Sequence, residues 1–212
     1  MITVYHLEQS RSTRVLWLLE ELGLPYDLMQ YARDPMTRLA PPELKAVHPL
    51  GKAPVIRDTE GAGIVAESGA IIEYLIETYG AGRLKPPIGT KEWAHYIQWM
   101  HFAEGSAMLP LLLKLYTGFL GEGGKPLEWR IDSEIDNHFS FIEHHLERTG
   151  RPFLCEMGLT GADIQMSFVL EAGAVRGGLA RYPSTSAYLG RLQALPAYQR
   201  ALERGGAVTP SR

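Results

Sequence analysis

The chain has 212 residues, of which 45% are hydrophobic and 21% are charged, with a formal net charge of -3. These proportions are typical of a soluble globular protein with room for two small domains. The charge gives no indication of a nucleic-acid or membrane partner. The apolar runs are too short to cross a bilayer, and the first residues lack the basic start of a signal peptide, so we expect a cytoplasmic protein.

The N-terminal residues predict a β-α-β unit. Residues 2–6 alternate between apolar and polar side chains, which indicates a strand. A helix follows, because apolar residues recur with helical spacing before Gly23, a typical residue just past a helix end. These residues are Val15, Leu18, Leu19 and Leu22. A second strand at residues 26–31 would pair in parallel with the first through a right-handed crossover.

A hairpin and a helix complete the first domain. Residues 32–47 contain three prolines and predict an irregular or weakly helical segment. Short strands at residues 54–57 and 64–67 flank a glycine-rich turn, and an apolar helix runs from Ser68 to Gly80. This order predicts a four-stranded mixed sheet covered by helices within residues 1–80.

The rest of the chain predicts an all-helical domain. Residues 81–90 form a linker rich in glycine and proline, after which strand signals stop. We expect helices at 91–117, with bends at Gly105 and Pro110, and then around a regular apolar stripe ending at Gly150. The stripe comprises Ile131, Ile135, Phe139, Ile142 and Leu146. Later helices are predicted from Thr160, at 184–194 and at 196–204, so that residues 91–212 form one helical domain.

The start of the helix at Thr160 is strongly specified. Thr160 and Asp163 have the spacing of a capping box, with Asp in place of the usual Glu. Leu159 and Ile164 occupy the two positions of a hydrophobic staple. We expect this feature to have a structural role.

The segment 48–56 and the pair Glu67-Ser68 predict a binding site for an extended ligand. Pro54 opens a Pro-Val-Ile run, which indicates either a strand start or a cis peptide bond. A cis bond would turn the main chain of Ala53 outward, where its N–H and C=O could pair with a ligand. Ser68 begins a helix, whose N-terminus can hold an anion. Together these features indicate a pocket of peptide size.

These motifs resemble those of cytosolic glutathione transferases over essentially the whole chain. Each motif alone is weak, but their order and spacing are highly specific. They are the Ser10-Arg11-Ser12 turn, Gly51-Lys52-Ala53-Pro54-Val55, Glu67-Ser68, the linker, and the capping box of Thr160 and Asp163. The Ser-Arg-Ser turn and the segment 99–106 are most similar to bacterial and fungal serine-type members.

The resemblance implies a fold and an activity. The fold is an α/β thioredoxin-like N-terminal domain, with the order βαβ-α-ββα, that holds glutathione as co-substrate. An all-α helical bundle follows and closes a hydrophobic site for the second substrate. The activity is attack of the glutathione thiolate on a small hydrophobic electrophile, in a homodimer. The candidates to line the second site are Met100, Met108, Leu112 and Tyr116.

The resemblance also assigns ligand contacts. It implies that Pro54 is cis and that the main chain of Ala53 pairs with the cysteinyl part of glutathione. Glu67 and Ser68 would hold the γ-glutamyl end, with Lys52 as a nearby cation. These roles suit an extended anionic tripeptide, which needs main-chain pairing in the middle and charge complements at its ends. An isolated lysine would otherwise be a solvated loop charge, and Ser68 caps its helix in either case.

Ser10 is the candidate catalytic residue. A glutathione thiol must lose its proton near neutral pH, although an ordinary thiol has a pKa of about 8.5. A hydroxyl donor at the N-terminus of the first helix would stabilise the thiolate. Ser12 is a second hydroxyl expected at glutathione, and Tyr5, at the end of the first strand, is the rival donor. The plain alternative for either serine is a helix cap.

Several other activities are disfavoured. The N-terminal turn lacks a cysteine, which argues against glutathione-dependent thiol reduction and against isomerases with a Ser-Cys signature. His101 and Glu104 lack further ligands for a metal, and Glu104 is instead a candidate for the interdomain cleft. The single cysteine, Cys155, excludes an intrachain disulfide and is expected in the core. The open alternatives are a non-catalytic glutathione-binding protein on the same fold and a glutathione-dependent peroxidase.

Overall fold

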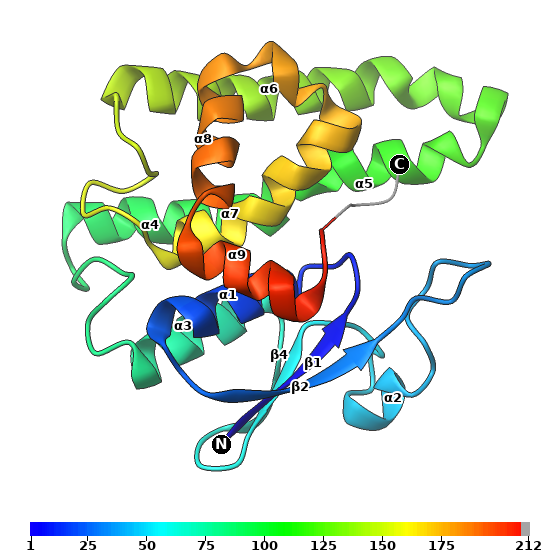
Figure 1. Ribbon diagram of the computed structural model, residues 1–212. Coiled ribbons are helices and arrows are strands. Elements are labelled where there is room, and N and C mark those ends of the chain that lie inside the picture. The colour runs from blue at the N-terminus through cyan, green and yellow to red at the C-terminus, as the bar shows by residue number, and fades with distance from the viewer. Residues whose placement is uncertain (209–212) are drawn as a thin grey trace. The chain divides into compact units, whose positions relative to one another are not determined.

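The computed structural model describes residues 1–208, which fall into two compact units (Figure 1). Unit 1 comprises Met1–Arg83 and the C-terminal stretch from Gln193, and unit 2 comprises Leu84–Leu192. The sequence-based division at 91–212 differs from this grouping at the C-terminal end. The reason is that α9 (Pro196–Gly205) packs on α1 (Thr13–Leu22). There the rings of Trp17 and Tyr198 meet edge to face, with centroids 5.2 Å apart.

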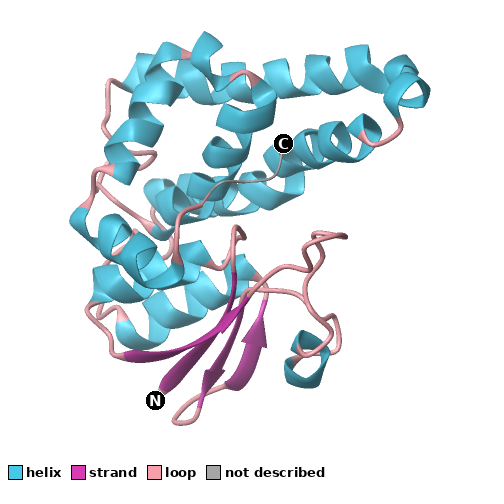
Figure 2. Ribbon diagram, turned by 45° about the vertical axis from the view of Figure 1, so that its right-hand side comes forward, coloured by secondary structure: helices cyan, strands magenta, loops and turns pink. Residues whose placement is uncertain are grey.

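Unit 1 contains the predicted four-stranded mixed sheet. Its strand order is β2 (Tyr26–Tyr31), β1 (Ile2–Leu7), β3 (Val55–Asp58) and β4 (Gly63–Ala66). The β1–β2 pair is parallel and the other two pairs are antiparallel, which confirms the predicted crossover and hairpin. Figure 2 shows the strands of this sheet together.

Helices cover both faces of the sheet. On one face, α1 packs with α3 (Ser68–Tyr79), which starts and ends as the sequence predicts. The short α2 (Leu44–Val47) lies on the other face and is the only helix of the irregular segment 32–47 among the described residues. Leu44 of α2 packs with Tyr5, Leu7 and Val55 in an apolar cluster. Alternation along β1 therefore turns Tyr5 towards α2, and His6 towards the helices of the opposite face.

Unit 2 is helical, as predicted. It contains α4 (Lys91–Phe102), α5 (Met108–Gly118), α6 (Lys125–Thr149), α7 (Gly161–Ala172) and α8 (Pro183–Gln193). Short π-helices lie between them at Ala103–Ala107 and Gly173–Gly177, and short 3-10 helices at Gly121–Gly124 and Leu179–Arg181. The turn at Ala103–Ala107 is a π-helix around Gly105, so the predicted helix 91–117 is interrupted where a bend was expected.

The predicted capping box is present at the start of α7. The backbone N–H of Thr160 donates to Oδ2 of Asp163 at 2.8 Å, and both residues are fully buried. Oδ1 of Asp163 also accepts from the Leu154 N–H at 2.9 Å and from the Tyr188 hydroxyl at 2.6 Å. Because every residue of α7 is buried, this cap secures the central helix of unit 2.

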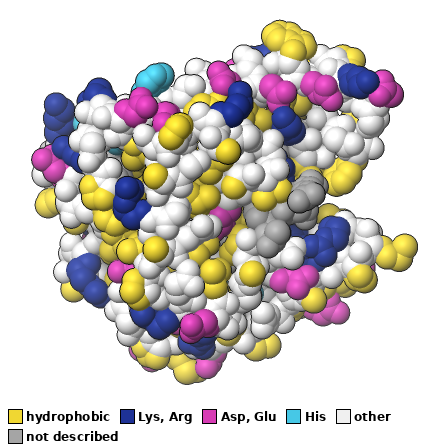
Figure 3. Space-filling view, turned by 45° about the horizontal axis from the view of Figure 1, so that its top comes forward, with side chains coloured by type: hydrophobic (Ala, Val, Ile, Leu, Met, Phe, Trp, Pro, Cys, Tyr) yellow, Lys and Arg dark blue, Asp and Glu magenta, His cyan; other side chains and the backbone are white. Residues whose placement is uncertain are grey.

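The surface carries both signs of charge. On the face drawn in Figure 3, lysine and arginine side chains are interspersed with aspartate and glutamate, which fits the small net charge. None of the described helices has the length and apolar character that a bilayer crossing needs.

Candidate functional site

The predicted site residues lie together at one end of the unit 1 sheet. Tyr5 of β1 pairs with Val55 at the start of β3, and Val55 pairs with Ala66 at the end of β4. Three segments therefore meet at this end of the sheet: the turn that follows β1, the residues that precede β3 and the residues that follow β4. The sheet register thus brings the Ser10 turn, Ala53 and the Glu67-Ser68 pair to one end of unit 1.

The Ala53–Pro54 peptide bond is cis, which confirms the expectation for Pro54. Ala53 is half-buried and Lys52 is exposed. Among residues 1–208, none forms a hydrogen bond with the N–H or C=O of Ala53. Both groups are therefore available to a ligand that runs alongside them in extended conformation.

Glu67 has an unusual backbone. Its φ of 71° lies in the left-handed region, which is uncommon for a residue other than glycine. Its side chain is exposed, and the next residue, Ser68, opens α3 and is buried. Strain of this kind is typical of functional sites, because the surrounding structure must hold it in place.

Sequence reasoning missed a buried cation beside Ser68. Nη1 of Arg14 donates to Oγ of Ser68 at 3.2 Å, and Arg14 is only 1% exposed. The signal was present, since Leu18 lies one turn further along α1 and is buried, which places residue 14 on the inward side. The positive charge of Arg14 and the N-terminus of α3 both favour an anion at this position.

Ser10 and Ser12 belong to a buried hydrogen-bonded cluster. Ser10 Oγ lies 2.7 Å from Ser12 Oγ and donates to the carbonyl oxygen of Leu7 at 2.8 Å. The Ser12 N–H donates to Ser10 Oγ at 3.2 Å, and Ser12 Oγ lies 2.9 Å from Nδ1 of His6. Ser10 is 6% exposed and Ser12 is fully buried.

The third member of this cluster, His6, was interpreted from the sequence only as a strand residue. Its ring is fully buried, and its Nε2 lies 2.8 Å from the carbonyl oxygen of Gly205 in α9. Burial lowers the pKa of His6 from its ordinary value, although the Gly205 carbonyl and the charge of Glu8 oppose this. Sequence alone offers no signal for a contact across 199 positions.

Tyr5 lies apart from that cluster. Its ring is buried with Leu7, Leu44 and Val55 on the α2 side of the sheet, whereas His6 points to the opposite face. The predicted alternation, with Tyr5 opposite to Val4 and His6, is confirmed. The hydrogen-bonded hydroxyl groups of the turn therefore contact His6 and not Tyr5.

Arg33, just after the end of β2, holds the main chain of this turn in place by hydrogen bonds. Nε of Arg33 donates to the carbonyl oxygen of Glu8 and Nη2 to that of Gln9, each at 3.1 Å. The N–H of Arg33 donates to the Glu8 carboxylate at 3.0 Å. These bonds fix the main chain just before Ser10.

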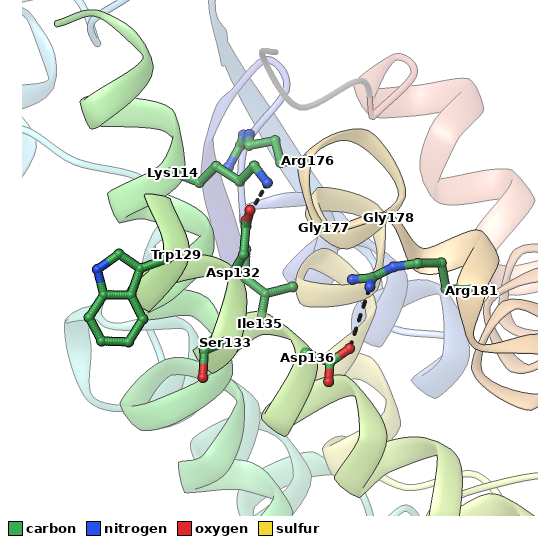
Figure 4. Close-up of a pocket in the computed structure, with 10 residues that line it drawn as sticks. All are labelled: Lys114, Trp129, Asp132, Ser133, Ile135, Asp136, Arg176, Gly177, Gly178 and Arg181. Carbon is green, nitrogen blue, oxygen red and sulfur yellow. Dashed lines mark hydrogen bonds and ion pairs between the residues drawn. The ribbon is translucent and has the colours of Figure 1, made fainter. Parts of the chain in front are cut away.

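Unit 2 has cavities of its own. Figure 4 shows one of about 750 Å³ between α5, α6 and residues 176–181. Its walls carry two ion pairs, Lys114–Asp132 at 2.5 Å and Arg181–Asp136 at 3.5 Å, so it is polar. A smaller cavity of about 390 Å³ lies beside Phe119. None of the predicted glutathione contacts lines either cavity.

The candidates for a hydrophobic site divide between core and surface. Met100 and Met108 are buried in the core, Leu112 is half-buried and Tyr116 is 58% exposed. Tyr116 belongs to an exposed apolar stripe on α5 with Leu109 and Leu113, and the exposed Leu120 follows just beyond the end of that helix. This stripe, rather than the buried methionines, could contact an apolar molecule.

Cys155 and His145 belong to unit 2. Cys155 is buried, as expected, and burial raises its thiol pKa to about 12. His145 is half-buried: its Nε2 lies 3.1 Å from the Leu154 carbonyl oxygen, and its ring meets that of Trp99 edge to face. No group of three or more metal-ligating side chains occurs in the described part of the chain.

The chain is similar to several known proteins. The family profile described as "Glutathione S-transferase, N-terminal domain" matches residues 10–78. Glutathione S-transferase 1 of Saccharomyces cerevisiae is 30% identical over 98% of this chain and 97% of its own length. The crystal structure of a glutathione S-transferase from Actinobacillus pleuropneumoniae superposes with a TM-score of 0.87 at 36% identity, covering 98% of this chain and 94% of that one.

Glutathione is bound in a related structure. It is that of a glutathione transferase family member from Pseudomonas fluorescens, described with two glutathione bound. It has a TM-score of 0.79 and 29% identity, and covers 95% of this chain and 92% of that one.

Proposed function

Because this chain belongs to the glutathione S-transferase family and is a glutathione S-transferase by homology, we propose that it joins the thiol sulfur of glutathione to small hydrophobic electrophiles. The observation that carries this proposal is the arrangement of residues at one end of the unit 1 sheet. There the cis Ala53–Pro54 bond and the open main chain of Ala53 share one end of the sheet with the Ser10 hydroxyl.

Glutathione lies extended along this end of the sheet. The main chain of Ala53 pairs with its cysteinyl part, as a strand pairs with a neighbour. Ser68, with Arg14 behind it, holds the γ-glutamyl carboxylate, and Glu67 holds the ammonium group of the same residue. Lys52 is exposed and adds a cation. The buried Arg14 and the N-terminus of α3 support this orientation, since both attract negative charge.

Ser10 stabilises the thiolate. It lies just before α1, whose N-terminal end favours negative charge, and its side chain is slightly exposed, whereas that of Ser12 is not. Ser12 is fully buried and acts behind Ser10. The thiolate then attacks the electrophile as a nucleophile, and the sulfur–carbon bond forms as the leaving group departs or as electrons shift within the acceptor.

Features of unit 2 support the proposals for the second substrate and for the assembly. The exposed apolar stripe on α5 suits a hydrophobic electrophile. Exposed apolar side chains elsewhere in unit 2, including Trp129 and Phe141, support a homodimer, because large apolar groups left in water favour association. A single buried cysteine is compatible with a cytoplasmic location.

The test combines binding and turnover. Wild-type protein should be retained on immobilised glutathione and should conjugate glutathione to an aromatic halide. Glu67→Gln should weaken glutathione binding about tenfold or more, since it removes a charge-assisted contact. The matched control is Glu60→Gln, which neutralises an exposed carboxylate on the same hairpin, close to the far edge of the sheet.

The outcomes distinguish the proposed transferase from the two alternative functions. Failure of the wild type to bind glutathione at millimolar concentration would overturn the proposal. Tight binding without conjugation would favour the non-catalytic binding protein, and turnover of organic hydroperoxides alone would favour the peroxidase. Equal loss in both glutamate variants would refute the specific role of Glu67.

A further inference from the structure

A continuous hydrogen-bonded chain leads from the candidate thiolate site into the core of unit 1. It runs from Ser10 Oγ to Ser12 Oγ over 2.7 Å and on to His6 Nδ1 over 2.9 Å. From the other side of the ring, His6 Nε2 reaches the Gly205 carbonyl over 2.8 Å. These are hydrogen-bond distances throughout, so a proton can pass along the chain without any side chain moving far.

The directions of these bonds follow from the Gly205 carbonyl. A carbonyl oxygen only accepts, so Nε2 of His6 carries the ring proton. In the neutral ring Nδ1 then has a lone pair, and Ser12 donates its hydroxyl proton to it. Ser10 has one hydroxyl proton left for two acceptors, Ser12 Oγ and the Leu7 carbonyl, the latter at 2.8 Å.

The cluster therefore has more hydrogen-bond contacts than protons to fill them, and Ser12 Oγ also lies 3.1 Å from the Leu7 carbonyl oxygen. The cluster has four contacts of 2.9 Å or less, at Gly205, between His6 and Ser12, between the two serines, and at Leu7. The neutral cluster holds only three mobile protons, one on Nε2 and one on each hydroxyl. One added proton on Nδ1 would let His6 donate to Ser12, Ser12 to Ser10, and Ser10 outward or to Leu7.

We propose that this cluster takes up the proton that the glutathione thiol loses, with His6 as its final acceptor. The proposal rests on the proposed function, because the thiol must lie at Ser10. The S–H bond breaks and its electron pair stays on sulfur as the thiolate. Its proton passes to Ser10 Oγ, the proton of Ser10 passes to Ser12 Oγ, and the proton of Ser12 passes to Nδ1 of His6. His6 acts through the two serines and does not touch glutathione.

The two charges that result lie at favourable helix ends. The thiolate forms near the N-terminus of α1, where the helix dipole stabilises an anion. The imidazolium forms against a carbonyl in the last turn of α9, where the dipole stabilises a cation. Separation of charge along this chain is thus supported at both ends.

The surroundings of His6 act on its pKa in both directions. Full burial lowers the pKa and holds the ring neutral before glutathione binds, whereas the Gly205 carbonyl and the charge of Glu8 favour the protonated form. The facing residue on β2 is Gln30, which is uncharged, and Leu16 of α1 is apolar. Gly205 allows the close approach, because a Cβ there would lie 3.1 Å from Nε2 of His6 and 2.4 Å from Leu16 Cδ1.

The direct test is nitrogen NMR of the full chain labelled with 15N-histidine. Titration with glutathione at neutral pH should move the Nδ1 signal of His6 from an unprotonated to a protonated position. S-methylglutathione, which lacks the thiol proton, should bind but leave Nδ1 unprotonated. His145 is the internal reference, since its Nε2 also lies on a backbone carbonyl, at 3.1 Å, but in unit 2. Its signals should stay in place with both ligands.

A variant adds a functional readout. In His6→Gln the site retains a polar side chain but cannot take up a proton, so the thiol of bound glutathione should ionise at higher pH, with about tenfold less thiolate at neutral pH. Its affinity for S-methylglutathione should equal that of the wild type, which also shows that the variant is folded. His145→Gln is the matched control and should leave the thiol ionisation unchanged.

The outcomes distinguish this proposal from the proposed function. If both ligands bind and Nδ1 of His6 stays unprotonated with glutathione, the proton goes elsewhere and the relay is wrong, while the transferase function stands. If neither ligand binds, both proposals fall. If Nδ1 becomes protonated with both ligands, binding alone changes the ring and the thiol is not the proton donor.

Discussion

The guanidinium of Arg14 donates to the hydroxyl of Ser68 over 3.2 Å, which joins the first turns of α1 and α3. The two residues are 54 positions apart, and both are buried. A buried cation therefore stands beneath the serine that begins the second of these helices. This relationship gives the proposed glutathione site of unit 1 a fixed positive charge.

We expect Arg14→Met to weaken glutathione binding about tenfold or more, because it removes this charge from the position where the γ-glutamyl carboxylate of glutathione is proposed to bind. Arg14→Lys retains the charge without the planar fork and should lose less affinity. Calorimetric titration with glutathione measures the effect, and thermal unfolding checks that each variant is folded. Wild-type affinity in a folded Arg14→Met protein would rule out a role for Arg14 in ligand binding.

Glu143 of α6 caps α8, and this cap should make stability depend on pH. Its carboxylate accepts from the N–H groups of Ser184 and Thr185 at 2.8 and 2.7 Å. Burial opposes ionisation, but these hydrogen bonds prevail and hold the pKa of Glu143 below its usual range. A depressed pKa stabilises the fold above the ordinary value of about 4.5, and this stability is lost as the pH falls through the folded-state pKa.

Glu143→Gln should therefore cost about 1–3 kcal/mol at neutral pH and less in acid, which flattens the acid limb of the stability profile. Denaturant unfolding between neutral and acid pH measures this. Glu147→Gln, an exposed position on the same helix, serves as control and should change stability little. Parallel profiles for wild type and Glu143→Gln would contradict the capping role.

Cys155 should not react in the folded protein. It is 3% exposed, and burial raises its thiol pKa to about 12, so very little thiolate forms at neutral pH. A coloured thiol reagent should label it only at the rate of unfolding, and fully in denaturant. Fast stoichiometric labelling of native protein would show that the segment around Cys155 opens.

Gly205→Ala should destabilise unit 1, whereas Gly190→Ala should not destabilise unit 2. A Cβ at Gly205 would meet Leu16 Cδ1 at 2.4 Å, and a Cβ at Gly190 meets nothing within 4 Å. Overpacking of this kind costs about 1–3 kcal/mol, while the second change, inside α8, gains up to about 1 kcal/mol. Thermal unfolding compares the two, and equal melting temperatures would mean that α9 moves freely away from His6.

Local signals in the sequence were sufficient to predict most of the fold. Alternation in residues 2–6, the glycine that ends α1 and the capping box at Thr160 each depend on near neighbours, and all are present. The proline at the start of a strand left two interpretations open, a strand start or a cis bond, and the resemblance to glutathione transferases implied the cis bond, which is present. The same resemblance named the three segments of the candidate site before the sheet register showed that they lie at one end of the sheet.

Contacts between distant residues could not be predicted in this way. His6 meets Gly205 across 199 positions, and α9 lies with the sheet of unit 1 although it follows the helical unit in sequence. Such contacts depend on how helices pack, which periodicity does not encode. Arg14 is intermediate, because its place on the inward side of α1 follows from helical spacing, but its partner Ser68 does not.

The central claim is that Ser10 stabilises the thiolate of glutathione bound at one end of the unit 1 sheet. Its most direct test is a pH titration of the thiolate absorbance of glutathione bound to wild type, to Ser10→Ala and to the control Ser186→Ala, whose hydroxyl donates to Leu179 in unit 2. Affinity for S-methylglutathione verifies that the site is intact in each protein. In wild type and control the bound thiol should ionise well below the ordinary pKa of about 8.5, and in Ser10→Ala it should ionise at least about one pH unit higher. A Ser10→Ala protein that binds glutathione with an unchanged thiol ionisation would contradict the claim.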